Sequence, residues 1–368
     1  MNLLFLQCLD QAGGGSRASL RTTLRALRGQ RPDWRLALAT GNLGPLSLQA
    51  LEWGVNHAVM TMPHFRNHLQ RPAYWLACRR LAGWARTIRP DLILSNEWVT
   101  APHALSAGRR LGIPAMSYVR DFAALERGRK YQLHRMDRLL CVCESMRRGL
   151  IGAGYDPEKV STVYNPVLRP AFREPGAEMR ARIHRHAGVD RWLLYLGRIS
   201  PRKNQIAAVE TLRCLRGKTG QSWGLLLAGD ADESYASQVD QAAAAAGLKD
   251  AVLRLGIVPE PGWLFELAEA SVLTSKSEGL ARVLIESFLC GKPGFSFPLD
   301  GLEDIYGEEL PFFVPERAAP VDLALTIAAA VDNTSLCHER TEQLRIMLEQ
   351  RHSLESHVNS FEAALGPV

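Results

Sequence analysis

The sequence lacks several features that would assign it to a simple class. No apolar run reaches the roughly 18 residues of a membrane-spanning helix, so we expect none. Met1 to Leu9 lack the basic start and small-residue cleavage site of a secretory signal peptide, which favours a cytoplasmic protein. The seven cysteines show no C-x-x-C pair and no zinc-ligand spacing. We therefore expect reduced thiols and no bound metal.

Common catalytic and nucleic-acid-binding motifs are missing as well. The sequence has no G-x-S-x-G elbow, Walker loop or H-E-x-x-H pair. No helix-turn-helix, zinc-finger or aromatic-stacking motif accompanies the arginines, so nucleic acid is not an expected partner. With 46% hydrophobic and 22% charged residues, the composition is that of an ordinary globular protein. A length of 368 residues exceeds what one core usually supports and predicts two domains.

Positive charge is concentrated in the first part of the chain. Residues 1–150 carry a net charge of +13, and the remainder carries −7. Four arginines recur at helical spacing, which places them on one face of a predicted helix: Arg17, Arg21, Arg25 and Arg28. This stripe is either a solvated helix face or a surface for an anionic partner, such as a membrane or a lipid-linked phosphate.

Short apolar runs alternate with amphipathic stretches along the whole chain, which predicts an α/β fold with parallel sheets. The expected strands are residues 3–7, 35–39, 92–95, 115–118 and 138–143, then 192–196, 224–228, 251–255, 270–273 and 295–297. Three prolines in residues 166–175 indicate a linker. We predict Rossmann-like domains at 1–165 and 176–348 that face each other across a cleft, and a closing helix at 349–368.

The most informative stretch contains two glutamates, Glu278 and Glu286, with seven residues between them. Residues 270–273 should form a buried strand, 275–279 its turn and 281–289 a helix. Three backbone N–H groups at that helix start favour an anion such as a diphosphate, namely those of Gly279, Leu280 and Ala281. Alternatively, Glu286 forms an ordinary helical ion pair with Arg282, four residues earlier.

A second site follows the predicted strand 192–196. There the chain turns through Arg198 and Lys203, two cations suited to stabilising a departing phosphate without a metal. The alternative is a solvated basic loop. Gly229, Asp230 and Asp232 follow the next strand, and we interpret their Asp-x-Asp pattern as a strand-end turn rather than as a metal site.

A third glycine-rich segment, Gly13, Gly14 and Gly15, follows the first predicted strand. Glycines there allow the backbone to approach a phosphate or sugar closely, and Ser16 can cap the following helix. The segment does not contain the dinucleotide fingerprint G-x-G-x-x-G. A plain strand-to-helix turn would also explain it.

With these residues, the sequence resembles the family 4 retaining glycosyltransferases of GT-B architecture over nearly its whole length. The resemblance is carried by Glu278 to Glu286, by the Cys290-Gly291-Lys292-Pro293 segment that follows, and by the turn from Gly197 to Lys203. Weaker support comes from the glycine loop, from Cys143-Glu144-Ser145-Met146, from Val163-Tyr164-Asn165-Pro166 and from the closing helix after Arg351. In the family, that last helix crosses back to the N-terminal domain.

The resemblance implies a role for each matching residue. Arg198 and Lys203 would hold the diphosphate of a sugar donor, Glu286 the ribose hydroxyls, and Glu278 the transferred sugar. Gly229 is a further donor-binding candidate, and base specificity would come from backbone contacts near Gly256 and Ile257. In such enzymes the leaving phosphate itself receives the proton of the acceptor, and no metal is required.

One segment departs from the pattern of many relatives. They carry a histidine after the strand at 115–118, where this chain has Arg120 and Asp121. Arg120 becomes a candidate ligand for an anionic group of the donor sugar or acceptor, and Asp121 could orient it.

The implied activity is transfer of a sugar from a UDP- or GDP-sugar to a glycan or lipid-linked acceptor. The expected setting is the biosynthesis of bacterial surface polysaccharide or lipopolysaccharide, at the inner face of the cytoplasmic membrane. The alternatives are a GT-B sugar-nucleotide epimerase and a catalytically silent GT-B binding module.

Overall fold

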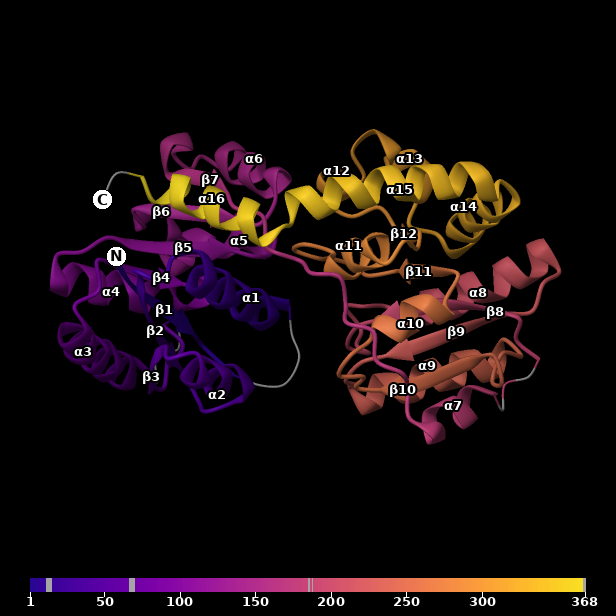
Figure 1. Ribbon diagram of the computed structural model, residues 1–368, viewed down its shortest axis with the longest axis horizontal. Helices are drawn as coiled ribbons and strands as arrows, with labels where there is room; N and C mark the ends of the chain where they lie inside the picture. Colours follow the sequence, from indigo (N-terminus) through magenta and orange to yellow (C-terminus); the bar gives the residue numbers. More distant parts are fainter. Residues whose placement is uncertain (11–14, 66–69, 185, 187, 367–368) are drawn as a thin grey trace. The chain divides into compact units, whose positions relative to one another are not determined.

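A computed structural model describes residues 1–368, except 11–14, 66–69, 185, 187 and 367–368 (Figure 1). The chain divides into two compact units. Unit 1 contains Met1–Val167 and Arg351–Val368, and unit 2 contains Leu168–Gln350. The C-terminal segment therefore belongs to the N-terminal unit. Within the described residues, no helix is both long and apolar enough to cross a bilayer.

Unit 1 is a parallel sheet whose order in the described residues is β3-β2-β1-β4-β5-β6-β7. Its strands are β1 (Asn2–Gln7), β2 (Arg35–Thr40), β3 (Asn56–Val59), β4 (Leu92–Ser95), β5 (Ala115–Val119), β6 (Arg138–Cys141) and β7 (Val160–Thr162). Its α-helices are α1 (Gly15–Gln30), α2 (Pro45–Glu52), α3 (Arg71–Ile88), α4 (Ala101–Leu111), α5 (Ala123–Arg127), α6 (Glu144–Gly152) and α16 (Leu354–Leu365). Strand order reverses between β1 and β4.

Unit 2 contains a smaller parallel sheet of order β10-β9-β8-β11-β12 in its described part. The strands are β8 (Arg191–Leu196), β9 (Trp223–Ala228), β10 (Val252–Gly256), β11 (Ala270–Leu273) and β12 (Gly294–Ser296). The α-helices are α7 (Ala177–His184), α8 (Gln205–Thr219), α9 (Glu233–Ala245), α10 (Gly262–Leu267), α11 (Arg282–Leu289), α12 (Glu303–Tyr306), α13 (Leu310–Phe313), α14 (Pro320–Asp332) and α15 (Thr334–Arg351). Here the order reverses between β8 and β11.

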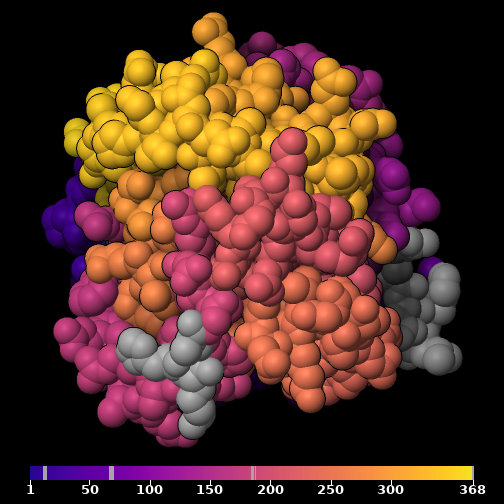
Figure 2. All heavy atoms as spheres, turned by 90° about the vertical axis from the view of Figure 1, so that its right-hand side faces the viewer, coloured from indigo at the N-terminus to yellow at the C-terminus, as the bar shows by residue number. Residues whose placement is uncertain are grey.

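Burial on both faces explains the apolar strand sequences. Every residue of β4, β9 and β11 is buried, because helices cover both sides of a parallel sheet. In unit 2, α14 packs against α8, and Figure 2 shows the yellow-orange end of unit 2, which includes α14, beside the salmon-coloured part of the chain that includes α8. Helices on both faces leave the ends of the strands for ligands, and parallel sheets of this kind bind ligands at the carboxyl ends.

The predicted strands are found in the sheets, with boundary differences of up to two residues. The largest boundary difference is at the predicted strand 138–143. Strand β6 ends at Cys141, and Cys143 is already the N-cap of α6. Two short strands, β3 and β7, were not predicted. Both lie at the edges of the sheet, where half-buried residues lack the continuous apolar pattern of central strands.

The closing segment packs against α1 within unit 1. Arg31 and Glu362 form an ion pair there, and the Thr23 hydroxyl lies 3.0 Å from Nε2 of His357. Nδ1 of His357 lies 2.8 Å from the carbonyl oxygen of Tyr164. These contacts hold residues of the closing helix, α16, between α1 and the segment that follows β7.

Candidate functional site

The acidic and basic loops of unit 2 lie where its strand order reverses. β8 and β11 are hydrogen-bonded neighbours, so the loops at their carboxyl ends are adjacent. The backbone N–H of Lys276 donates to the carbonyl oxygen of Arg202 at 2.9 Å. The Thr274 hydroxyl donates to the carbonyl oxygen of Asn204 at 2.8 Å. The two loops therefore form one continuous surface at the switch point, the usual ligand position of such sheets.

Glu278 is the centre of a charged cluster on this surface. Nζ of Lys203 donates to Oε1 of Glu278 at 2.5 Å, and the Ser275 hydroxyl donates to the same oxygen at 2.6 Å. Nη1 of Arg202 lies 3.4 Å from the other carboxylate oxygen. The Glu278 side chain is only 9% exposed and that of Lys203 14%. Two cations share one carboxylate, so the cluster carries an excess positive charge that favours an anionic ligand.

Arg198 belongs to the same turn but does not contact Glu278. Its Nε lies 3.8 Å from Oδ2 of Asp230, and its side chain is 63% exposed. Such a long and exposed ion pair contributes little stability, so the guanidinium can turn toward a ligand at small cost. Asp232 accepts hydrogen bonds from the N–H groups of Ser234 and Tyr235 and thereby caps α9. Its carboxylate thus has a structural partner.

Two glycines make the turn possible. Gly197 and Gly229 have φ of 156° and 148°, which side-chain-bearing residues rarely adopt. A Cβ atom on Gly229 would lie 2.3 Å from the carbonyl oxygen of Gly197. The ends of β8 and β9 therefore approach each other more closely than any residue with a side chain would allow. This approach fixes where the chain carrying Arg198 leaves the sheet.

Glu286 lies on α11, one turn from the start of the helix. Nη2 of Arg282 is 3.4 Å from Oε1 of Glu286, so the helical ion pair considered from the sequence is present. Burial raises the pKa of Glu286 above its ordinary value, and Arg282 acts in the opposite direction. The helix begins at Arg282, one residue later than predicted, with Ala281 as its N-cap. Gly279 and Leu280 lie in the preceding loop.

The end of β10 completes the edge of this sheet. The carbonyl oxygen of Gly256, a residue with φ of 73°, accepts a hydrogen bond from the N–H of Gly229 at 2.8 Å. The next side chain, Ile257, is 63% exposed. Gly256 and Ile257 are thus next to the turn at Gly229 in space. A role of these residues in base recognition stays a prediction.

In unit 1, Arg120 is the centre of a polar network at the end of β5. Its guanidinium donates to the side-chain oxygen of Asn96 at 2.6 Å and to that of Asn165. Nε of Arg120 also donates to the backbone carbonyl of Asn96 at 2.8 Å. The guanidinium lies over the ring of Tyr118, 4.1 Å from its centroid. Three residues, Asn96, Asn165 and Tyr118, thus fix one cation at the carboxyl end of the sheet.

Asp121 does not orient Arg120, contrary to our expectation from the sequence. Oδ2 of Asp121 accepts a hydrogen bond from Nε1 of Trp98 at 3.1 Å. Trp98 in turn packs edge-on against Tyr131. The guanidinium of Arg120 instead donates to the side-chain oxygens of Asn96 and Asn165.

The glycine segment after β1 is only partly described. Gly13 and Gly14 lie outside the described residues, and Gly15 is the first residue of α1. The hydroxyl of Ser16 donates to Glu97, which follows β4, at 2.5 Å. β1 and β4 are the strands between which the order of this sheet reverses, so Ser16 and Glu97 lie where parallel sheets of this kind commonly bind ligands.

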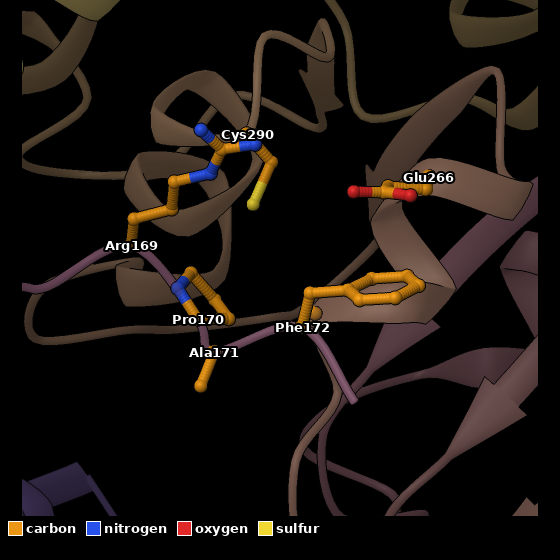
Figure 3. Close-up of a pocket in the computed structure, with 7 residues that line it drawn as sticks. Arg169, Pro170, Ala171, Phe172, Glu266 and Cys290 are labelled. Carbon is orange, nitrogen blue, oxygen red and sulfur yellow. The ribbon is translucent and has the colours of Figure 1, made fainter. Parts of the chain in front are cut away.

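A cavity of about 280 Å³ lies elsewhere in unit 2. Figure 3 shows Arg169 extending toward Cys290, with Glu266 and Phe172 on the opposite side. Burial raises the pKa of the Cys290 thiol, and Arg169 acts in the opposite direction. None of the predicted site residues lines this cavity.

Two family models match the chain, one in each unit. The model for glycosyltransferase family 4 matches residues 13–167, and the model for glycosyl transferases group 1 matches residues 179–347. Together they account for most of both units. The chain belongs to the group 1 glycosyltransferases. This glycosyltransferase has the GT-B fold, with parallel sheets in two α/β units.

The curated relatives are distant, and the similarity covers only part of each chain. The Vi polysaccharide biosynthesis protein VipC/TviE of Salmonella typhi is 26% identical over 208 residues, which cover 54% of this chain and 35% of the relative. A D-inositol 3-phosphate glycosyltransferase of Frankia alni is 30% identical, with 58% of each chain covered. The chain thus spans less than two thirds of the length of these relatives.

Solved structures establish the fold of the glycosyltransferase over its whole length. Anabaena HepE, in complex with UDP and glucose, has a TM-score of 0.79 at 19% identity and covers 100% of this chain and 99% of its own. A glycosyltransferase from Rickettsia africae has a TM-score of 0.81 at 14% identity, with 100% of both chains covered.

Several residues of the candidate site were not anticipated from the sequence. Arg202 and Ser275 contact Glu278, and Asn96 and Asn165 hold Arg120. Arg202 lies in the basic turn that was singled out, so charge at a strand end was a usable signal. Asn165 lies in a segment that supported the family resemblance, but neither asparagine was given a role, because residues 96 and 165 follow different strands and meet only in the folded sheet.

Proposed function

We propose that this chain is a retaining glycosyltransferase that moves a sugar from a UDP- or GDP-sugar to a glycan or lipid-linked acceptor. The observation that carries the proposal is the cluster at the switch point of unit 2, where Lys203 and Arg202 share Glu278. The complexes of Anabaena HepE with UDP and with UDP-glucose support UDP as the first nucleotide to test.

Lys203 and Arg198 would bind the donor diphosphate in this proposal. A diphosphate competes with Glu278 for Lys203, and it can recruit the exposed guanidinium of Arg198. Fixed cations stabilise the charge that develops on the leaving phosphate, which is the main electrostatic demand of the reaction. We propose that no metal is required, since these side chains supply the positive charge.

Glu278 and Glu286 would recognise the sugars of the donor. Displaced from Lys203 by the diphosphate, the Glu278 carboxylate can accept hydrogen bonds from the transferred sugar. Glu286 would accept hydrogen bonds from the ribose hydroxyls. The acceptor hydroxyl would attack from the face on which the phosphate leaves, so the phosphate takes its proton and the anomeric configuration is retained.

The acceptor would bind to unit 1 near Arg120, whose fixed guanidinium suits an anionic group such as a phosphate or uronate. We place the reaction in the assembly of bacterial surface polysaccharide or lipopolysaccharide, in keeping with the name of the Salmonella relative. The net charge of +13 in residues 1–150 supports association with the anionic inner face of the cytoplasmic membrane.

The test is hydrolysis of UDP-, GDP- and ADP-sugars, with NMR of the released sugar. We expect turnover of one donor with retained configuration and without loss on addition of EDTA. Lys203→Gln and Glu278→Ala should each lower turnover strongly. The matched control is Lys249→Gln, an exposed lysine of unit 2 that precedes β10 at the opposite end of the strand.

Each alternative has its own outcome in this assay. An inverted anomer contradicts the retaining mechanism, and recovery of an epimerised nucleotide sugar identifies an epimerase. Nucleotide binding without turnover of any donor, unchanged by Glu278→Ala, identifies a binding module. Equal nucleotide affinity in wild type and in the Arg198→Gln/Lys203→Gln double variant contradicts the placement of the diphosphate.

A further inference from the structure

Helix α3 of unit 1 exposes large apolar side chains on the face that points away from the sheet. Its other face is buried and packs against α4, through Tyr74, Ala77, Cys78, Leu81, Ala82 and Ala85. On the outward side, Trp75 is 55% and Leu76 49% exposed. Figure 1 shows α3 at the outer edge of unit 1, beside α4. Two neighbouring large apolar residues without cover are typical of an interaction surface.

The same helix is strongly and uniformly basic. Residues 71–90 contain five arginines and no acidic residue: Arg71, Arg79, Arg80, Arg86 and Arg89. Arg79 and Arg80 are exposed and follow Trp75 and Leu76 by four residues, so they lie one turn further along the same face. Among the described residues, neither arginine pairs with a carboxylate.

The other exposed helices of unit 1 do not combine these two properties. The arginine stripe of α1 includes exposed Arg21, Arg25 and Arg28, but no large apolar side chain of α1 is exposed. Helix α2 exposes Leu48 and Leu51 but contains no basic residue. Only α3 offers tryptophan, leucine and unpaired arginines together in the described part of the unit.

We infer that α3 is the element by which unit 1 docks on an anionic lipid bilayer. Tryptophan and leucine insert at the boundary between headgroups and acyl chains, and arginines bind the lipid phosphates around them. This inference rests on the membrane association proposed above and names the surface responsible.

The test is sedimentation with phosphatidylcholine vesicles with and without phosphatidylglycerol, in the absence of any donor. Wild type should bind only the anionic vesicles, and less at high salt. At about 1 kcal/mol per basic residue near the surface, Arg79→Ser/Arg80→Ser should weaken binding by about thirtyfold. Trp75→Ser/Leu76→Ser should also reduce binding, including the part that persists at high salt. The matched control Arg21→Ser/Arg25→Ser should bind more tightly than either α3 variant.

The outcomes separate the parts of the proposal. If wild type does not bind anionic vesicles, membrane docking is wrong, while glycosyl transfer is judged independently by donor hydrolysis. If the α3 variants bind like wild type, or the α1 variant loses as much as they do, docking through α3 is wrong. Thermal unfolding of each variant tests whether a folding defect causes the loss of binding. We expect unchanged melting temperatures, because all the substituted side chains are solvent-accessible.

Discussion

Substitution of Gly229 by alanine tests whether the close approach of β8 and β9 builds the turn that carries Arg198. A Cβ atom there would lie 2.3 Å from the carbonyl oxygen and 2.6 Å from the carbonyl carbon of Gly197. Both are backbone atoms, so the strand ends must separate. The φ of 148° adds conformational strain. Strain of about 1–3 kcal/mol and overpacking of a similar size give a destabilisation of about 2–6 kcal/mol.

The control is Gly197→Ala, whose φ of 156° is equally unfavourable. Its Cβ atom would meet only the end of the Lys203 side chain, at 3.7 Å, so it should carry the strain without the overlap. For a unit of this size we expect a lower melting temperature by about 5–20 °C in Gly229→Ala and by roughly half as much in Gly197→Ala. Calorimetry measures both, and titration with UDP should show weaker binding to Gly229→Ala. Equal stability of the two variants would refute the argument from strand approach.

Three further predictions concern the charged groups. Glu278→Gln releases Lys203, so UDP alone should bind at least as tightly as to wild type in calorimetric titration, while turnover falls by about 10- to 100-fold because bonds to the sugar weaken. A parallel loss of UDP affinity would show that Glu278 orients Lys203 for the nucleotide. Burial lowers the pKa of His357 to about 4, so the unfolded state takes up its proton first as the pH falls below about 6.5. The stability that this group contributes is complete above that pH and is lost toward pH 4, by about 2 kcal/mol at pH 5. In urea unfolding, the stability of His357→Gln should depend correspondingly less on pH. The same pH dependence in the variant and in wild type would contradict the assignment to His357. Arg120→Lys should reduce transfer to the acceptor more than donor hydrolysis, since lysine cannot reach Asn96 and Asn165 together. An equal loss of activity in both assays would show that Arg120 acts on the donor rather than on the acceptor.

The central strands and the unit 2 loops could be predicted because their signals are local. Residues 270–273 form β11 as expected, since an apolar run bounded by polar residues is typical of a strand covered on both faces. The basic turn after β8 was likewise visible as charges following such a run. The two loops are adjacent because β8 and β11 are neighbours in the sheet.

Contacts between distant residues could not be predicted in the same way. Arg120 was expected to pair with Asp121, its neighbour in sequence, and instead bonds Asn96 and Asn165. These residues are separated by 24 and 45 positions from it. Edge strands β3 and β7 were missed because half-buried residues leave no continuous pattern.

The sequence by itself determined the parallel α/β architecture and the family resemblance, and it supplied the residues that we propose to bind a nucleotide sugar, because each rests on short patterns of burial, charge and glycine. Only the tertiary structure decided which partner each charge has: Glu278 with Lys203 and Arg202, Asp121 with Trp98, and Arg120 with two asparagines. The physical reason is that partners come from the ends of different strands, and strand order, which the local pattern does not encode, brings them together.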